Sequence, residues 1–181
     1  VVTASVDDTA RLWNTEQGRP LATLEGHKNS VNSAAFSPDG KTVLTSSYDG
    51  TVRLWSGYDG SNLATLEGLP HNVSFASFSP DSVTVVTASK DNTAQLWRSD
   101  FGTPISTLKG HTGDVLYAAF SPDGKTVVTA SKDKTARLWN TEDVRPLSNL
   151  VGHRYIVSHA AFSPDGKTVV TASYDQTAQL W

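Results

Sequence analysis

Residues 27–66 read HKNSVNSAAFSPDGKTVLTSSYDGTVRLWSGYDGSNLATL, and this stretch contains the pattern that decides the fold. Short runs of apolar and β-branched residues alternate with turns rich in glycine, proline and aspartate. The runs predict four strands, at Val31–Phe36, Thr42–Ser46, Thr51–Trp55 and Leu63–Leu66. Four antiparallel strands joined by short turns form one small sheet, so the sequence predicts an all-β fold.

The pattern recurs every 42 residues, and the tryptophans mark it at positions 13, 55, 97, 139 and 181. A repeat of this length with four strands per unit is the signature of a β-propeller, in which each sheet is one blade. Both faces of a blade are apolar, so neighbouring blades must stack to bury them. We expect about five blades in an open arc, with the first and last incomplete. Their predicted ranges are 1–24, 27–66, 69–108, 111–150 and 153–181.

Composition narrows the class of protein. The chain contains no cysteine, which excludes disulfide frameworks, thiolate chemistry and zinc–cysteine sites, and fits a reducing, cytoplasmic compartment. Its net charge is −3 without a basic block, which argues against a nucleic-acid surface. The fraction of hydrophobic residues, 38%, is typical neither of a disordered chain nor of a membrane-spanning one. It begins within a predicted strand and without methionine, so we expect it to be part of a longer protein.

Two residue types keep a fixed distance from each tryptophan: a threonine 10 residues before it and an aspartate 6 before it. In three of the repeats a histidine also stands 28 residues before the tryptophan. Complete sets are His27, Thr45, Asp49 and Trp55, then His111, Thr129, Asp133 and Trp139, then His153, Thr171, Asp175 and Trp181. Partial sets are Thr3, Asp7 and Trp13, and Thr87, Asp91 and Trp97.

Together with the Gly-His dipeptides at 26–27, 110–111 and 152–153, these sets resemble the WD-repeat (β-transducin-like) family over the whole chain. The resemblance implies a structural hydrogen-bond network in each blade, with threonine where the family often has serine. It also implies a larger ring, commonly of seven blades. The third repeat departs most from the family pattern, because Leu69 stands in the histidine position and His71 is displaced by two residues.

Two catalytic interpretations are weaker than this structural one. A hydroxyl, a histidine and an aspartate suggest a hydrolase, but an enzyme needs one activated nucleophile rather than several copies. Residues 35–42 also fit a permissive phosphate-loop pattern, yet Pro38 removes a backbone N–H and a strand rather than a helix follows. No histidine has a second ligand at metal spacing, so we expect neither a metal nor a cofactor.

The leading hypothesis is that the chain is a non-catalytic platform for protein or peptide binding. A more specific form of this hypothesis is that the platform is the sensor or regulatory region of a larger signalling protein. The resemblance implies partner contacts on the narrow face that carries the turns between second and third strands. These contacts would involve the residue before each network aspartate and the third and fifth residues after each histidine position. The candidates are Tyr48, Lys90, Lys132, Tyr174, Ser30, Asn32, Asn72, Ser74, Asp114, Leu116, Ile156 and Ser158.

The alternative is a nucleic-acid or small-ligand site in the central channel. The face offers only Lys90 and Lys132, against Asp114, so we rank this alternative lower, and a hydrolase third. We also expect the isolated chain to self-associate, since open edges and bare apolar faces drive association.

Overall fold

The computed structural model describes residues 1–67 and 72–181, which form 18 strands and no helix. The strands make five antiparallel sheets, each taking its strands in chain order. The first sheet holds β1 (Val2–Ala4), β2 (Ala10–Trp13) and β3 (Pro20–Leu24), and the second β4 (Val31–Phe36), β5 (Thr42–Ser47), β6 (Val52–Ser56) and β7 (Asn62–Leu66). The third holds β8 (Val73–Phe78), β9 (Thr84–Ser89), β10 (Thr93–Arg98) and β11 (Pro104–Lys109). The fourth holds β12 (Val115–Phe120), β13 (Thr126–Ser131), β14 (Thr135–Asn140) and β15 (Pro146–Val151), and the fifth β16 (Val157–Phe162), β17 (Val169–Ser173) and β18 (Ala178–Leu180).

The all-β prediction is therefore confirmed, and the strand ends in the second sheet agree with the predicted ones to within one residue. The predictions for Leu69 and His71 concern residues outside the described part of the chain.

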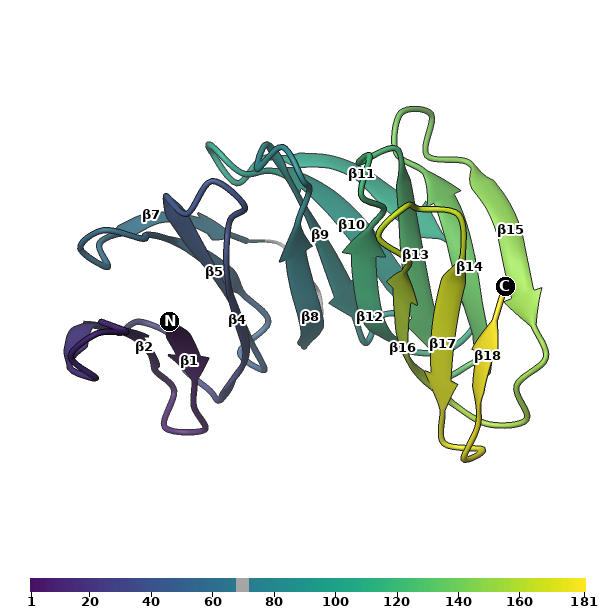
Figure 1. The fold of residues 1–181 in the computed structure, drawn as a ribbon, viewed down its shortest axis with the longest axis horizontal. Helices are drawn as coiled ribbons and strands as arrows, with labels where there is room; N and C mark the ends of the chain where they lie inside the picture. The colour runs from purple at the N-terminus through teal and green to yellow at the C-terminus, as the bar shows by residue number, and fades with distance from the viewer. Residues whose placement is uncertain (68–71) are drawn as a thin grey trace.

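The five sheets, or blades, follow one another in an open row (Figure 1). Inner strands contact the inner strand of the next blade along the row, as in β4 with β8, β8 with β12 and β12 with β16. In the first blade, β1 is the counterpart of β5 and contacts β4. The N-terminus lies with the first blade at one end of the picture and the C-terminus with the fifth at the other (Figure 1).

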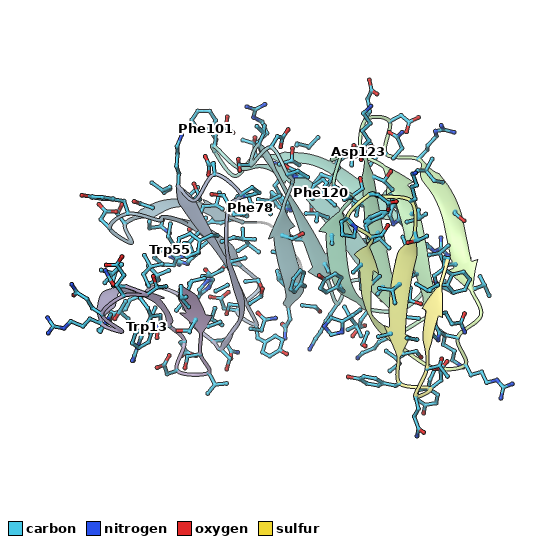
Figure 2. All side chains as sticks on the ribbon, viewed as in Figure 1. Trp13, Trp55, Phe78, Phe101, Phe120 and Asp123 are labelled. Carbon is cyan, nitrogen blue, oxygen red and sulfur yellow. The ribbon has the colours of Figure 1, made fainter. Side chains whose placement is uncertain are left out.

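Four hydrophobic cores hold the row together, one at each junction between neighbouring blades. The second strand of a blade explains the arrangement, since its side chains alternate between the two faces. Val43 packs with Leu12 and Trp55 in the core toward the first blade, whereas Leu44 packs with Val85 in the core toward the third. Figure 2 shows Trp13 and Trp55 in the first two blades. The buried apolar residues of these cores lie between neighbouring blades. Each fully buried Val or Leu stabilises the fold by about 1.5–3 kcal/mol.

The fifth blade has one bare face. Val170 is 40% exposed, whereas Val128, its counterpart one repeat earlier, is fully buried against the fifth blade. Leu180 on the adjacent strand is 77% exposed.

The described part of the chain offers no helix with the length and hydropathy to cross a bilayer.

Each complete inner strand carries a β-bulge that strand alternation does not show. In β4, Val31 pairs with Ser47 and Ser33 with Ser46, which leaves Asn32 as an extra residue. The extra residues in the other inner strands are Ser74, Leu116 and Ser158. A bulge inserts one residue and turns the side chains that follow it. Val31 and Ala34 consequently pack into one core although they are three residues apart.

Candidate functional site

The second blade contains a chain of side-chain hydrogen bonds from its core to its surface. Trp55 Nε1 donates to Thr45 Oγ1 at 2.8 Å, and Thr45 Oγ1 lies 2.7 Å from His27 Nε2. His27 Nδ1 lies 3.0 Å from Asp49 Oδ2. The tryptophan can only donate and the ionised carboxylate can only accept. The threonine hydroxyl must therefore donate to Nε2, and a neutral histidine with its proton on Nδ1 donates to the aspartate.

We call this Trp–Thr–His–Asp chain the relay, and two more blades repeat it. In the fourth blade the three distances, in the same order, are 2.8, 2.7 and 2.7 Å, at Trp139, Thr129, His111 and Asp133. In the fifth blade they are 2.9, 2.7 and 2.9 Å, at Trp181, Thr171, His153 and Asp175.

The third blade shows what happens when the sequence has leucine in the histidine position. Trp97 Nε1 still donates to Thr87 Oγ1, at 3.0 Å. Among the described residues, the hydroxyl of Thr87 donates to the backbone carbonyl of Gln95, at 3.4 Å. That bond is longer than those in the complete relays. In the first blade, Trp13 donates to Thr3 at 2.8 Å.

The aspartate at the end of the relay ties two segments of the turn surface together. Asp49 Oδ2 accepts the backbone N–H of Lys28 at 2.8 Å, and Oδ1 accepts both the N–H and the hydroxyl of Thr51, at 2.8 and 2.7 Å. Burial on its own would raise the pKa of Asp49, but the hydrogen bonds from Lys28, Thr51 and His27 outweigh it and lower the pKa to about 2. The carboxylate therefore remains ionised and holds the turn at neutral pH.

Burial has the opposite consequence for the histidines. It lowers the pKa of His27 and of His111, against the raising effect of the bonded carboxylates of Asp49 and Asp133. The lowered pKa agrees with the neutral tautomer that the relay requires.

The relays fix a surface, which we call the hairpin-turn face. It carries the turns between the second and third strands, which point to the lower edge of Figure 1, as the β17–β18 turn shows. The turn before β13, which includes Asp123, lies at the opposite edge (Figure 2).

Backbone hydrogen bonds join two groups of the predicted contact residues on this face. Tyr48 N donates to Ser30 O at 3.1 Å, and Lys132 N donates to Asp114 O at 2.9 Å. The corresponding pairs in the other blades are Lys90 with Asn72 and Tyr174 with Ile156. In the second to fifth blades, the residue before the network aspartate is thus anchored by its backbone.

A concavity of about 420 Å³ opens across the second to fifth blades. We call it the four-blade concavity. It is lined by Asn32, Tyr48, Ser74, Phe75, Lys90, Leu116, Tyr117, Lys132, Ser158, His159 and Tyr174. Eight of these eleven residues are predicted contacts. The other four predicted contacts, Ser30, Asn72, Asp114 and Ile156, lie outside its lining and accept the backbone bonds described above.

Aromatic rings form a row along this concavity. The rings of Phe75 and Tyr117 stack with centroids 4.3 Å apart, and Tyr117 meets His159 at 5.1 Å. On the rim, Lys90 Nζ lies 5.0 Å from the centre of the Tyr48 ring, and Lys132 Nζ pairs with Asp114 Oδ2 at 2.9 Å. Asn32 uses its amide to bridge blades, because Nδ2 donates to the carbonyls of Val73 and Ser74, at 2.8 Å each.

Comparison with known families matches the WD domain, G-beta repeat family at residues 18–56, 60–98, 102–140 and 144–181. The chain belongs to this family. The four matches follow the 42-residue period and end at or next to a relay tryptophan, as the WD-repeat resemblance predicted.

The curated relatives are WD-repeat proteins that match over about one repeat. A nuclear distribution protein PAC1 of Mycosarcoma maydis is 50% identical over 44 residues, which cover 24% of this chain and 10% of that protein. A ribosome assembly protein 4 of Chaetomium thermophilum is 49% identical over 41 residues, 23% of this chain and 8% of that protein. The human F-box-like/WD repeat-containing protein TBL1Y is 54% identical over 41 residues, again 23% and 8%. The aligned part of this WD-repeat chain thus spans a tenth or less of these relatives.

The WD-repeat relay has the connectivity of a hydrolase triad, with hydroxyl, imidazole and carboxylate in series. Its hydroxyl is not available as a nucleophile, however. Thr45 and Thr129 are fully buried, and each Oγ1 already accepts the indole N–H of its tryptophan. A substrate carbonyl therefore has no approach to the oxygen.

The turns that fit a phosphate-loop pattern are closed in this WD-repeat structure. Asp39 Oδ1 occupies the position of an anion, because it accepts the N–H of Lys41 at 3.1 Å and the hydroxyl of Ser37 at 2.6 Å. Strand β5 follows, where a phosphate loop needs a helix. Among the described residues, no group of three potential ligands is placed to hold a metal.

Phe75, Tyr117 and His159 were not among the predicted contacts. They share one position in the repeat, directly after the bulge residue, where the second repeat has Ser33. Strict alternation assigns neighbouring residues to opposite faces, so the bulge residue and its successor would not be expected in one concavity. The available signal was the alignment of the repeats, which places three rings at one position.

Proposed function

We propose that this chain is a non-catalytic interaction platform that binds a protein or peptide in the four-blade concavity of its hairpin-turn face. The observation that carries the proposal is the composition of the concavity, where tyrosines and lysines with an anchored backbone surround a row of rings. WD-repeat proteins typically act as scaffolds for protein interaction. Rigid aromatic anchors on a preorganised surface are the usual centre of such contacts.

Anchoring supports the proposal because it reduces the entropy lost on binding. The backbone of Tyr48 is held by Ser30 O, and the turn after it by the carboxylate of Asp49. A partner would therefore meet side chains whose backbone is already ordered. The role of the chain as a regulatory region of a signalling protein belongs to the same proposal. A cytoplasmic location is part of it, because a chain without cysteine fits a reducing compartment.

Photocrosslinking tests the proposal with a matched control in the same chain. A photoreactive phenylalanine analogue replaces Tyr48 or Tyr174 in the concavity, or Tyr58, which is 94% exposed in the loop after β6. Partners from the source cell should crosslink at positions 48 and 174 and be lost when Tyr117→Ala is added. A partner that crosslinks only at position 58 would place binding at the opposite edge, where the loop after β6 is bonded to the turn before β5, and would refute the proposal.

A further inference from the structure

The charged side chains of the four-blade concavity all have one sign. Its lining contains Lys90 and Lys132 and no carboxylate, although the chain as a whole carries a net charge of −3. Charge complementarity steers association and selects between partners. The concavity therefore favours an anionic partner on a protein that is otherwise acidic.

The two lysines are not equivalent. Lys132 is neutralised by Asp114, with 2.9 Å between Nζ and Oδ2. Lys90 Nζ lies over the ring of Tyr48, at 5.0 Å from its centre, and no carboxylate of the described residues forms an ion pair with it. A ring holds a cation in place without cancelling its charge. Lys90 is therefore positioned to receive a carboxylate from a partner.

The interior of the concavity is apolar. Phe75 and Leu116 supply carbon surface, and Tyr117 adds a phenol whose pKa is raised by burial, so the phenol keeps its proton and can donate a hydrogen bond. The volume of about 420 Å³ lies within the usual range of about 300–1,000 Å³ for ligand pockets. It can hold an apolar side chain together with its polar neighbour.

The geometry of the row argues against nucleic acid as the occupant. Nucleic-acid bases bind to proteins by stacking on the open faces of aromatic rings. The rings here are 4.3 and 5.1 Å apart, so they already occupy one another's faces.

We infer that the partner is a peptide segment in which an aspartate or glutamate stands next to an apolar or aromatic residue, with the carboxylate at Lys90 and the apolar side chain on Leu116 and Tyr117. This inference rests on the proposed function and adds the chemistry of the partner. The lining contains lysines but no arginine. Lys132 is paired with Asp114, so Lys90 is the lysine of the lining that has no carboxylate partner among the described residues. One positive charge matches the single negative charge of a carboxylate better than the charge of about −1.5 to −2 on a phosphate.

Selection from a random octapeptide library on the immobilised 181-residue chain tests both levels separately. We expect enrichment of Asp or Glu beside Phe, Tyr, Trp or Leu. Enrichment of neutral or basic peptides that still depends on Tyr117 would overturn the acidic assignment and leave the platform intact. Failure to enrich any peptide relative to a Tyr117→Ala, Leu116→Ala variant would overturn both.

Defined variants then locate the charge. For an enriched peptide, Lys90→Gln should weaken binding about fivefold, whereas Lys167→Gln, an equal charge change in the turn before β17, should leave it unchanged. Equal effects of the two variants would show general attraction only and overturn the placement at Lys90. Replacing the peptide's acidic residue by Gln should also weaken binding about fivefold, and tighter binding of a phosphoserine version would reassign the anion to phosphate.

Discussion

Replacing one buried threonine by valine in two different blades tests the contribution of the relay histidine. Thr129 and Thr87 are both fully buried, and both accept a tryptophan N–H, at 2.8 and 3.0 Å. Valine keeps the shape and removes the hydroxyl. In the fourth blade the change strands two groups, the indole N–H of Trp139 and Nε2 of His111. In the third blade, among the described residues, it strands chiefly the indole N–H of Trp97, because the bond to Gln95 O is long, at 3.4 Å.

A stranded buried polar group costs about 1–3 kcal/mol. Thr129→Val, which strands two groups, should therefore lower the free energy of unfolding by about 2–6 kcal/mol, and Thr87→Val, which strands one, by about 1–3 kcal/mol. Urea unfolding followed by far-UV circular dichroism measures both. In a double-mutant cycle, Thr129→Val and His111→Leu should couple by about 1–2 kcal/mol. Equal losses for the two threonine variants, together with no coupling, would show that the histidine adds nothing and would refute the relay argument.

Three further predictions concern acid, the buried indoles and the end of the row. Burial lowers the pKa of His27 and His111 in the folded state. The stability that these histidines contribute is therefore complete above about pH 6.5, the ordinary pKa of histidine, and is lost as the pH falls from there toward the lowered pKa of the folded state. Urea midpoints that stay constant from about pH 7.5 to 5 would contradict this prediction. Trp139→Ala should lower the free energy of unfolding in urea by about 3–5 kcal/mol, because the ring is only 1% exposed. Trp13→Ala should lower it clearly less, because Trp13 is only half-buried. The isolated chain should form dimers or larger species in light scattering, and Leu180→Lys should reduce them, because that side chain is 77% exposed on the bare face; a monodisperse monomer would be the contrary result.

The sequence was sufficient for the fold because the period repeats one set of local rules. The spacing of Trp55 from Thr45 and Asp49 recurs in every repeat, and the strands follow from it. The open row, the four junctions and the side-chain alternation of the second strands are consequences of stacking identical two-faced sheets.

The parts that could not be predicted are those in which one repeat differs from the next or in which the backbone leaves regular alternation. The bulge at Leu116 is a backbone feature and has no residue signature, since Asn32, Ser74 and Ser158 occupy the same position. The amide of Asn32 is used between blades because the neighbouring bulge presents two carbonyls to it. Contacts of that kind depend on two repeats at once, so reading a single repeat does not reveal them.

The relay also explains how a repeat can conserve stability while its surface varies. The carboxylate of Asp49 holds the turn through backbone N–H groups and Thr51, and the N–H of Tyr48 is bonded to a carbonyl, so the turn geometry does not depend on the Tyr48 side chain. The same position holds Val6, which is 84% exposed, as well as lysines and a second tyrosine. Exposed substitutions without structural partners change stability by about 0.5 kcal/mol or less, whereas loss of a buried relay group costs several times more. Recognition at the hairpin-turn face can therefore change from blade to blade without loss of the fold, and the differences among the repeats at this position are where the specificity of the chain is expected to lie.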